Sequence, residues 1–300
     1  MKYLKLLLVL AALSTLFVAC EDSAPFEYEE QRYVEGYLIV DKPIGPIGVL
    51  RTMPMDQKYD RTKAHIKDAI VTISVDDNEY QLEFVEEPGK DLGYYLKDES
   101  VIVEPMKRYN LKVVDGEKTY TGTTFTPTRI DWTLPPRPQL QFPLDTVNLP
   151  GNPDYDLAWA KEDQSDKNNF YLLMVKPLDT LNYGMYLDPP TQEMNRRNYH
   201  PFFNSGDGGE DVNEDENYYE TTTLNLIAND ETPTVWLAFK WFGKQDIQVF
   251  LADANMLKWY IMTWQQSTYD PNFGSIENGM GCFGSASVIS GETFLLKNQP

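Results

Sequence analysis

Histidine and cysteine are scarce in this chain, and their scarcity limits the catalysis that it can perform. Among 300 residues there are two histidines, His65 and His200, and two cysteines, Cys20 and Cys282. A Ser-His-Asp or Cys-His site would need one of these histidines, but neither is accompanied by a Gly-x-Ser-x-Gly nucleophile elbow or by partners at metal-ligand spacing. The sequence therefore disfavours a serine hydrolase and a histidine metal site. We expect both histidines to be structural or solvated, and Cys282, beside glycines and Phe283, to be a small buried thiol.

Basic residues are also few. The chain has 26 Lys and Arg against 46 Asp and Glu, which gives a formal net charge of −20. Nucleic-acid binding through phosphate neutralisation needs clustered Lys and Arg, and so does adsorption of a folded body to an anionic membrane. We therefore predict no nucleic-acid partner and no electrostatic adsorption of the folded body to lipid.

Long apolar segments are absent beyond the N-terminus. The run from Leu6 to Val18 is almost wholly apolar, but it is shorter than the roughly 20 residues that a membrane-spanning helix needs. Lysines precede the run and the small residue Ala19 ends it, which is the pattern of a secretory signal peptide. We therefore predict that residues 1–19 are a signal peptide and that the mature chain begins at Cys20.

The stretch Phe17-Val18-Ala19-Cys20 resembles a bacterial lipobox. In lipoproteins of that type the cysteine thiol is diacylated, the signal is cut before the cysteine, and the new amine is acylated. Several acyl chains, at about 0.8 kcal/mol per buried methylene, hold a protein firmly at a membrane. The resemblance implies that Cys20 is a lipid attachment site, which leaves Cys282 without a disulfide partner.

Residues 20–31 are expected to form a solvated acidic tether between the lipid and the folded body. The acidic residues in this stretch are Glu21, Asp22, Glu27, Glu29 and Glu30. In Bacteroidota-type lipoproteins, acidic residues directly after the cysteine resemble a signal for export to the cell surface. We therefore expect a lipid-anchored outer-membrane protein that faces the cell exterior.

Residues 32–129 have the pattern of a β-sandwich. The segment Tyr33–Val40 is rich in β-branched and aromatic residues. The turn Asp76-Asp77-Asn78 joins two further strand patterns, and Asp115-Gly116 is a strong hairpin turn. About seven strands without a helical period are typical of an immunoglobulin-like sandwich.

A proline-rich passage follows, and we place a domain boundary near Ile130 because proline favours extended, linker-like chain. Residues 130–300 are again β-rich. The strands expected there are Tyr155–Trp159, Phe170–Val175, Thr221–Ile227, Val235–Phe242, Ile247–Leu251 and Ala286–Leu296.

One helix is predicted after Asp253, a suitable N-cap residue. Apolar residues recur at helical spacing through Gln266, and we expect the aromatic side of this helix to pack on a sheet. The sequence thus predicts a mostly β protein. An N-terminal Ig-like β-sandwich leads to a second β-sandwich-like domain with one C-terminal helix.

A polar insertion near residues 180–220 interrupts the second domain, and a loop of that length is usually functional or disordered. Its carboxylates could supply calcium ligands, although their spacing does not fit the EF-hand pattern. We favour a solvated acidic loop, predict no cofactor, and keep as weak calcium candidates Asp207, Glu210, Asp211, Glu214 and Asp215.

Aromatic residues gather in and around the same insertion. Tyrosine and tryptophan faces can stack on sugar rings, so an exposed aromatic patch would be the leading ligand site. Some of these residues are expected to be core. The cluster comprises Tyr183, Tyr186, Tyr199, Phe202, Phe203, Tyr218 and Tyr219.

Several separated stretches resemble one family. They are the lipobox, Tyr33-Val34-Glu35-Gly36, Leu50–Pro54, Lys67–Val71 and Ser275–Gly284. Together they resemble the Bacteroidota lipoprotein family labelled "domain of unknown function 4249", except that Cys282 stands where an aliphatic residue is expected. Members resemble accessory lipoproteins found beside TonB-dependent outer-membrane transporters. The resemblance implies a role in nutrient capture and provides no catalytic residue.

Three functions are compatible with the sequence. The first, which we favour, is a non-enzymatic binding or accessory component partnering a TonB-dependent outer-membrane transporter. The second is a surface glycoside hydrolase that uses two carboxylates about 5–10 Å apart. The third is a structural or adhesive surface protein, which would expose a large apolar edge or assemble with itself.

Overall fold

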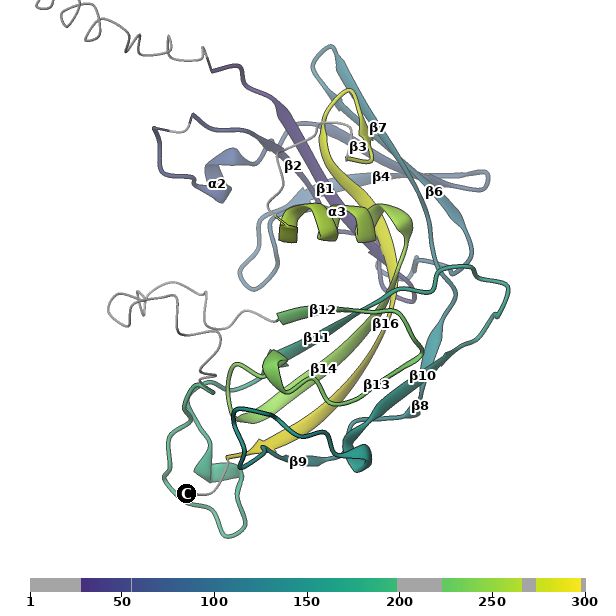
Figure 1. Ribbon diagram of the computed structural model, residues 1–300. Coiled ribbons are helices and arrows are strands. Elements are labelled where there is room, and N and C mark those ends of the chain that lie inside the picture. The colour runs from purple at the N-terminus through teal and green to yellow at the C-terminus, as the bar shows by residue number, and fades with distance from the viewer. Residues whose placement is uncertain (1–27, 55, 199–222, 266–273, 298–300) are drawn as a thin grey trace, which may run out of the picture.

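The computed structural model describes residues 28–54, 56–198, 223–265 and 274–297. These residues fold into a mostly β protein, as the sequence predicts (Figure 1). The first half contains the strands β1 (Arg32–Ile39), β2 (Ile47–Arg51), β3 (Ile70–Val75), β4 (Asn78–Val85), β5 (Gly93–Tyr95), β6 (Arg108–Asp115) and β7 (Lys118–Phe125), with the short helix α2 (Arg61–Ala64).

The second half adds the remaining strands and one longer helix, α3 (Ala254–Gln265). The strands are β8 (Ile130–Leu134), β9 (Gln139–Gln141), β10 (Leu157–Lys161), β11 (Tyr171–Pro177), β12 (Thr223–Ile227), β13 (Glu231–Thr232), β14 (Gly243–Ala252), β15 (Ile276–Glu277) and β16 (Met280–Leu296). Short 3-10 turns, η1 (Pro153–Tyr155), η2 (Gly184–Tyr186) and η4 (Trp236–Ala238), lie between them.

The first seven strands curl around one hydrophobic core. They follow a single hydrogen-bonded path, β1-β2-β5-β4-β3-β6-β7, because β4 pairs with both β3 and β5. The predicted hairpins are present, and Gly116 has the positive φ of 58° that its turn requires. The Ig-like arrangement itself is not confirmed, since this path does not divide into two separate sheets.

The second core lies between two sheets, which makes this half sandwich-like. The strands β12, β11, β14 and β16 form one layer, and the three-stranded sheet β13-β10-β8 forms the other. Trp159 of β10 and Leu173 of β11 are buried in the same cluster. The alternating burial along β14 places Ile247, Val249 and Leu251 in this core.

Strand β16 belongs to both cores. Its first part pairs with β1 in parallel, from Met280 to Ala286, and its second part pairs with β14 in the antiparallel sense, from Ala286 to Leu295. Phe283 is buried in the first core and Leu295 in the second. The boundary that we place near Ile130 stays a prediction, but the first core takes residues from both ends of the chain.

The predicted helix is confirmed as α3. The carboxylate Oδ1 of Asp253 accepts the backbone N–H of Met256 at 2.9 Å, as an N-cap does. Met262 is buried and the Trp259 ring lies against Tyr33 of β1 at a centroid distance of 5.9 Å. Within the described residues, no helix combines the length and the apolar character needed to cross a membrane.

One expected strand is wrong. The segment 235–242 forms η4 and irregular chain instead, with the N–H of Ala238 bonded to the carbonyl of Val235 at 2.9 Å. Trp236, Ala238 and Phe239 are all buried, so the apolar pattern reflects insertion into the core rather than pairing in a sheet. The last strand also begins earlier than expected, at Met280 instead of Ala286.

Candidate binding surface

Most residues that the sequence singles out for a site lie outside the described part of the chain. These are the lipid attachment site Cys20, the aromatics Tyr199, Phe202, Phe203, Tyr218 and Tyr219, and the calcium candidates Asp207, Glu210, Asp211, Glu214 and Asp215.

Two aromatics of the insertion are described, and both are packed. Tyr183 is buried, and its hydroxyl accepts the backbone N–H of Lys297 at 2.9 Å. The hydroxyl of Tyr186 donates to Oδ2 of Asp179 at 2.6 Å. These two rings therefore support the loop that carries them.

His65 and Cys282 lack the chemistry of catalytic residues. His65 is buried and neither ring nitrogen has a hydrogen-bond partner. Burial, followed by the charges of Arg61 and Lys67, lowers its pKa. Cys282 is the small buried thiol that the sequence predicts, and burial raises its pKa to about 12, so the thiol stays protonated at neutral pH.

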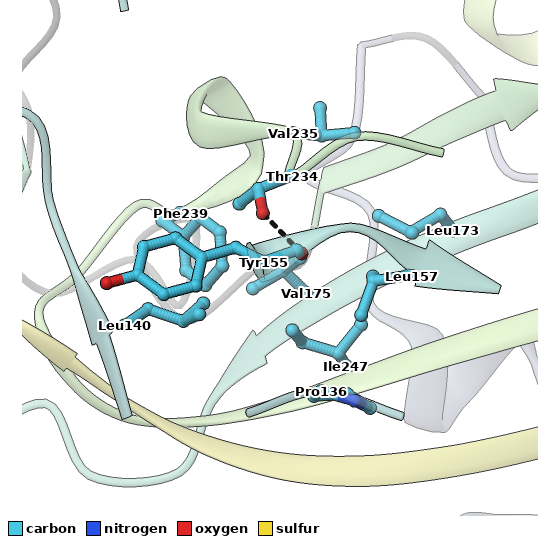
Figure 2. A pocket seen from close by; sticks show the side chains of 10 residues that line it. All are labelled: Pro136, Leu140, Tyr155, Leu157, Leu173, Val175, Thr234, Val235, Phe239 and Ile247. Atoms are coloured by element: carbon cyan, nitrogen blue, oxygen red, sulfur yellow. Dashed lines mark hydrogen bonds between the residues drawn. The ribbon is translucent and has the colours of Figure 1, made fainter. Parts of the chain in front are cut away.

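The cavity in the second core is small and apolar. Figure 2 shows its walls, which include Leu157, Leu173, Phe239 and Ile247. The hydroxyl of Thr234 donates to a backbone carbonyl at 2.7 Å and so is already satisfied. The volume of the cavity is about 10 Å³, which is roughly the room for one water molecule. This cavity does not accommodate a nutrient molecule.

A more suitable surface is the outer side of β1. Alternate residues of a strand point to opposite faces, so Val34 and Leu38 enter the first core while Tyr33, Glu35 and Tyr37 lie on the other face. We call these three side chains the β1 face. Each is only partly buried, which leaves polar and aromatic groups in reach of solvent.

Each of the two helices contributes one side chain to the β1 face. A guanidinium nitrogen of Arg61, in α2, lies 3.6 Å from a carboxylate oxygen of Glu35. Trp259 of α3 packs on Tyr33, as described above. In Figure 1, α3 is drawn across β1, and α2 lies beside β2. The face therefore combines an ion pair with aromatic rings.

Burial keeps the two tyrosine hydroxyls of this face neutral. Burial is the main cause that raises the pKa of Tyr33 and of Tyr37, and the nearby Glu35 carboxylate raises both further. The side chain of Arg61 is 63% exposed and that of Glu35 is 27% exposed. The β1 face thus offers neutral hydroxyls, a carboxylate and a guanidinium beside ring surfaces, which is a set suited to binding.

Three stretches that carry the family resemblance meet here. Tyr33 is opposite Leu50 in the β1–β2 pair, and Glu35 is opposite Cys282 in the β1–β16 pair. The fourth stretch, Lys67–Val71, leads into β3 of the same core, where Val71 is buried. The alternation of Tyr33, Glu35 and Tyr37 is visible in the sequence, but the elements that flank it come together only in the fold.

No group of three or more His, Cys, Asp or Glu side chains in the described ranges is arranged to hold a metal ion.

Comparison with known families identifies the chain. Residues 21–292 match the model of the family described as "Domain of unknown function (DUF4249)". The chain belongs to this family. No curated protein matches this DUF4249 member. A solved structure to which it is similar is a chimeric titin Z1Z2-Z1Z2 tandem functionalised with a GRGDS exogenous peptide from fibronectin. That similarity has 10% identity, covers 90% of this chain and 100% of that chain, and has a TM-score of 0.19, which is too low to support any argument.

Proposed function

We propose that this DUF4249 protein is a lipid-anchored outer-membrane protein, facing the cell exterior, that serves as a non-enzymatic binding component of a TonB-dependent nutrient uptake system. The observation that carries the binding role is the β1 face, where the Trp259 ring packs on Tyr33 and Glu35 of the same strand pairs with Arg61. The lipobox ending at Cys20 supports the anchor, and the family resemblance supports the partner.

The β1 face suits a hydroxylated ring ligand such as a neutral oligosaccharide. Aromatic faces stack on the apolar side of a sugar ring, while Glu35 accepts and Arg61 donates hydrogen bonds to its hydroxyl groups. A protonated thiol at Cys282 and an unpartnered imidazole at His65 provide no activated nucleophile nearby. Ligand capture therefore fits these residues better than turnover.

Ligand binding is tested with the purified full chain on an immobilised panel of neutral oligosaccharides. We expect at least one glycan to bind, and we expect Trp259→Ala and Glu35→Gln each to weaken binding about tenfold, which corresponds to about 1.4 kcal/mol. Trp132→Ala, a change to a half-buried tryptophan of β8, is the matched control and keeps wild-type affinity. Absence of binding, or equal losses in the control, would contradict the ligand assignment.

The anchor and the partner are tested in the native host. Mass spectrometry of the mature N-terminal peptide should show an acylated Cys20, and Cys20→Ala should release the protein from the membrane fraction. Affinity purification from solubilised outer membranes should retain a protein of transporter size. An unmodified Cys20, or recovery of the chain alone, counts against the proposed location and partner.

A further inference from the structure

Asn278 and Gly279 form the tight turn between β15 and β16, and they are the only Asn-Gly pair in the chain. Asn278 is exposed. Its φ of 63° lies in the left-handed region, which asparagine tolerates better than most residues do. On the strand before the turn, Glu277 is opposite Thr121 of β7, so the turn has a defined place in the first half.

An asparagine followed by glycine can react with its own main chain, because the next backbone nitrogen can attack the carbon Cγ of the side-chain amide. A side chain on the following residue hinders that approach, and glycine has none. The N–H of Gly279 donates no hydrogen bond within the described part of the chain. The attacking nitrogen can therefore lose its proton without breaking a bond that the described residues provide.

The side chain of Asn278 is also held weakly. Its Nδ2 donates to the backbone carbonyl of Thr119 at 3.3 Å, which is longer than the usual N–H···O distance of about 2.7–3.2 Å. The amide of Asn255, by contrast, bonds two carbonyls at 2.8 and 2.9 Å, and that of Asn195 bonds two at 2.7 and 2.8 Å. The Asn278 side chain can thus turn toward Gly279 by giving up only one long bond to a described residue.

We propose that Asn278 is a site of spontaneous deamidation that produces aspartate and isoaspartate. The deprotonated nitrogen of Gly279 forms a bond to Cγ of Asn278. The bond between Cγ and Nδ2 then breaks, and Nδ2 takes up a proton and leaves as ammonia. A five-membered succinimide ring remains, which contains the Gly279 nitrogen and both carbonyl carbons of Asn278.

Water opens the succinimide ring. It adds to one of the two carbonyl carbons, the bond from that carbon to the Gly279 nitrogen breaks, and the nitrogen regains its proton. Opening at Cγ gives aspartate. Opening at the main-chain carbonyl carbon of Asn278 gives isoaspartate, in which the main chain runs through the former side chain. In total one water is consumed and one ammonia is released, and nothing is oxidised or reduced.

The products alter a crowded part of the fold. A Cβ added to Gly279 would lie 2.7 Å from the Tyr120 ring, which shows how little room the backbone has there. Isoaspartate lengthens the main chain by a methylene group and so displaces this segment. Just after the turn, Met280 is opposite Tyr33 at the start of the β1–β16 pair. We therefore expect isoaspartate to weaken the attachment of β16 to β1 and of β15 to β7, whereas aspartate only adds a charge beside Glu277.

The site is tested by incubating the purified, folded full chain at neutral and at mildly alkaline pH, followed by peptide mass spectrometry. At Asn278 we expect a mass increase that corresponds to replacing the side-chain NH2 by OH, in two products that chromatography separates. The increase should be at least tenfold faster than at Asn78, an exposed asparagine of β4 that is followed by Glu79, because the side chain of Glu79 hinders the attack. It should be faster at the higher pH, since the attacking nitrogen must be deprotonated.

Two variants separate the chemistry from the fold. Gly279→Ala should slow the reaction at least tenfold, but its Cβ meets Tyr120 and can disturb folding. Asn278→Gln leaves Gly279 in place and should stop the modification over the same incubation, because the longer side chain has to close a six-membered ring. The urea midpoint of each variant shows whether it folds.

Three results would overturn the modification site: equal rates at Asn278 and Asn78, a wild-type rate in folded Gly279→Ala, or modification of the urea-unfolded chain alone. The structural consequence is measured on the separated products. The isoaspartyl fraction should have a lower urea midpoint than Asn278→Asp, which carries the charge on an unaltered main chain. Equal midpoints would overturn the proposed weakening of β15 and β16.

Discussion

Gly281 shows how one residue decides whether β1 and β16 can pair. It has a φ of +113°, and a Cβ added to it would lie 2.0 Å from the backbone carbonyl oxygen of Val34. Both the backbone conformation and the lack of space therefore require glycine. Gly116 has a φ of +58°, but a Cβ added there would meet no atom within 4 Å, so it needs glycine for conformation alone.

The two glycines form a matched pair. Gly281→Ala should lower the free energy of unfolding by about 3 kcal/mol or more, because backbone strain and a steric clash add together. Gly116→Ala should lower it by about 1 kcal/mol, since only strain applies. Urea unfolding at neutral pH measures both. Similar losses in the two variants would show that the space around Gly281 is not limiting.

His65 links the stability of the first core to pH. Its imidazole is buried without hydrogen-bond partners, and its ring lies 5.9 Å from that of Phe84. The charged groups that face it are Arg61 and Lys67, which lower its pKa, and Glu86, which raises it, but burial is the largest effect. The folded state therefore binds a proton less readily than the unfolded chain.

The sign of the pH effect follows from that difference. As the pH falls through the ordinary histidine pKa of about 6.5, the unfolded chain gains a proton that the folded protein does not, so stability falls on acidification. His65→Leu should reduce the drop in unfolding free energy between pH 7.5 and pH 5, measured with urea. His200→Leu, at the other histidine, is the control. An unchanged pH dependence in His65→Leu would contradict this assignment.

At the scale of elements, Asp253 joins α3 to both halves of the protein. It accepts bonds from the hydroxyl of Thr124 in β7 at 2.6 Å and from the backbone N–H groups of Ser285 in β16 and Met256 in α3. Burial raises its pKa. Next to it, the amide of Asn255 donates to carbonyls of β7 and β16 at 2.8 and 2.9 Å. These bonds set the position of α3 on the β1 face.

Removal of the Asp253 carboxylate should therefore cost more than an ordinary cap. We expect Asp253→Ala to lower the free energy of unfolding by about 3 kcal/mol, because it leaves buried donors unsatisfied as well as the helix uncapped. Asp253→Asn retains an acceptor oxygen and a good N-cap, so its loss should be about 1 kcal/mol. Urea unfolding followed by circular dichroism and tryptophan fluorescence measures both losses. Equal losses would show that the acceptor oxygen is unimportant.

Local elements of this protein could largely be predicted from sequence. The hairpin turns at Asp76 and Asp115-Gly116 depend on neighbouring residues, and so do the N-cap and apolar spacing of α3. The irregular conformation of the segment 235–242 could not be predicted, because its apolar pattern fits a strand as well as it fits a buried irregular segment. Only the surrounding core leaves it without a strand to pair with. The early start of β16 could not be predicted either, because glycines such as Gly281 usually indicate a turn. Here Gly281 instead permits close contact between β16 and β1.

At the scale of the whole molecule, the two cores share one long strand. Phe283 is fully buried in the first core, and Ile276 lies with it. In the described residues, β1 has β2 on one side and β16 on the other. The segment 28–129 by itself therefore lacks a neighbouring strand and part of its core.

We expect the isolated fragment 28–129 to be unfolded. Joining residues 274–287 to its C-terminus through a flexible Gly/Ser linker should restore folding, since it supplies Phe283 and the partner of β1. Far-UV circular dichroism and the dispersion of amide signals in NMR spectra measure the difference. A fragment 28–129 that folds without the added segment would show that the first half is an independent domain.

The sequence by itself determined the class of the protein: a strongly acidic chain of short strands and one capped helix, preceded by a stretch that resembles a lipobox. These features depend on composition and on residues close together in the chain. The tertiary structure alone decided that β16 serves two cores, that Glu35 meets Arg61 and Tyr33 meets Trp259, and that the turn at Asn278 lies exposed beside β7. Each of these depends on pairings between distant segments, which are selected by the packing of the complete chain rather than by any local preference.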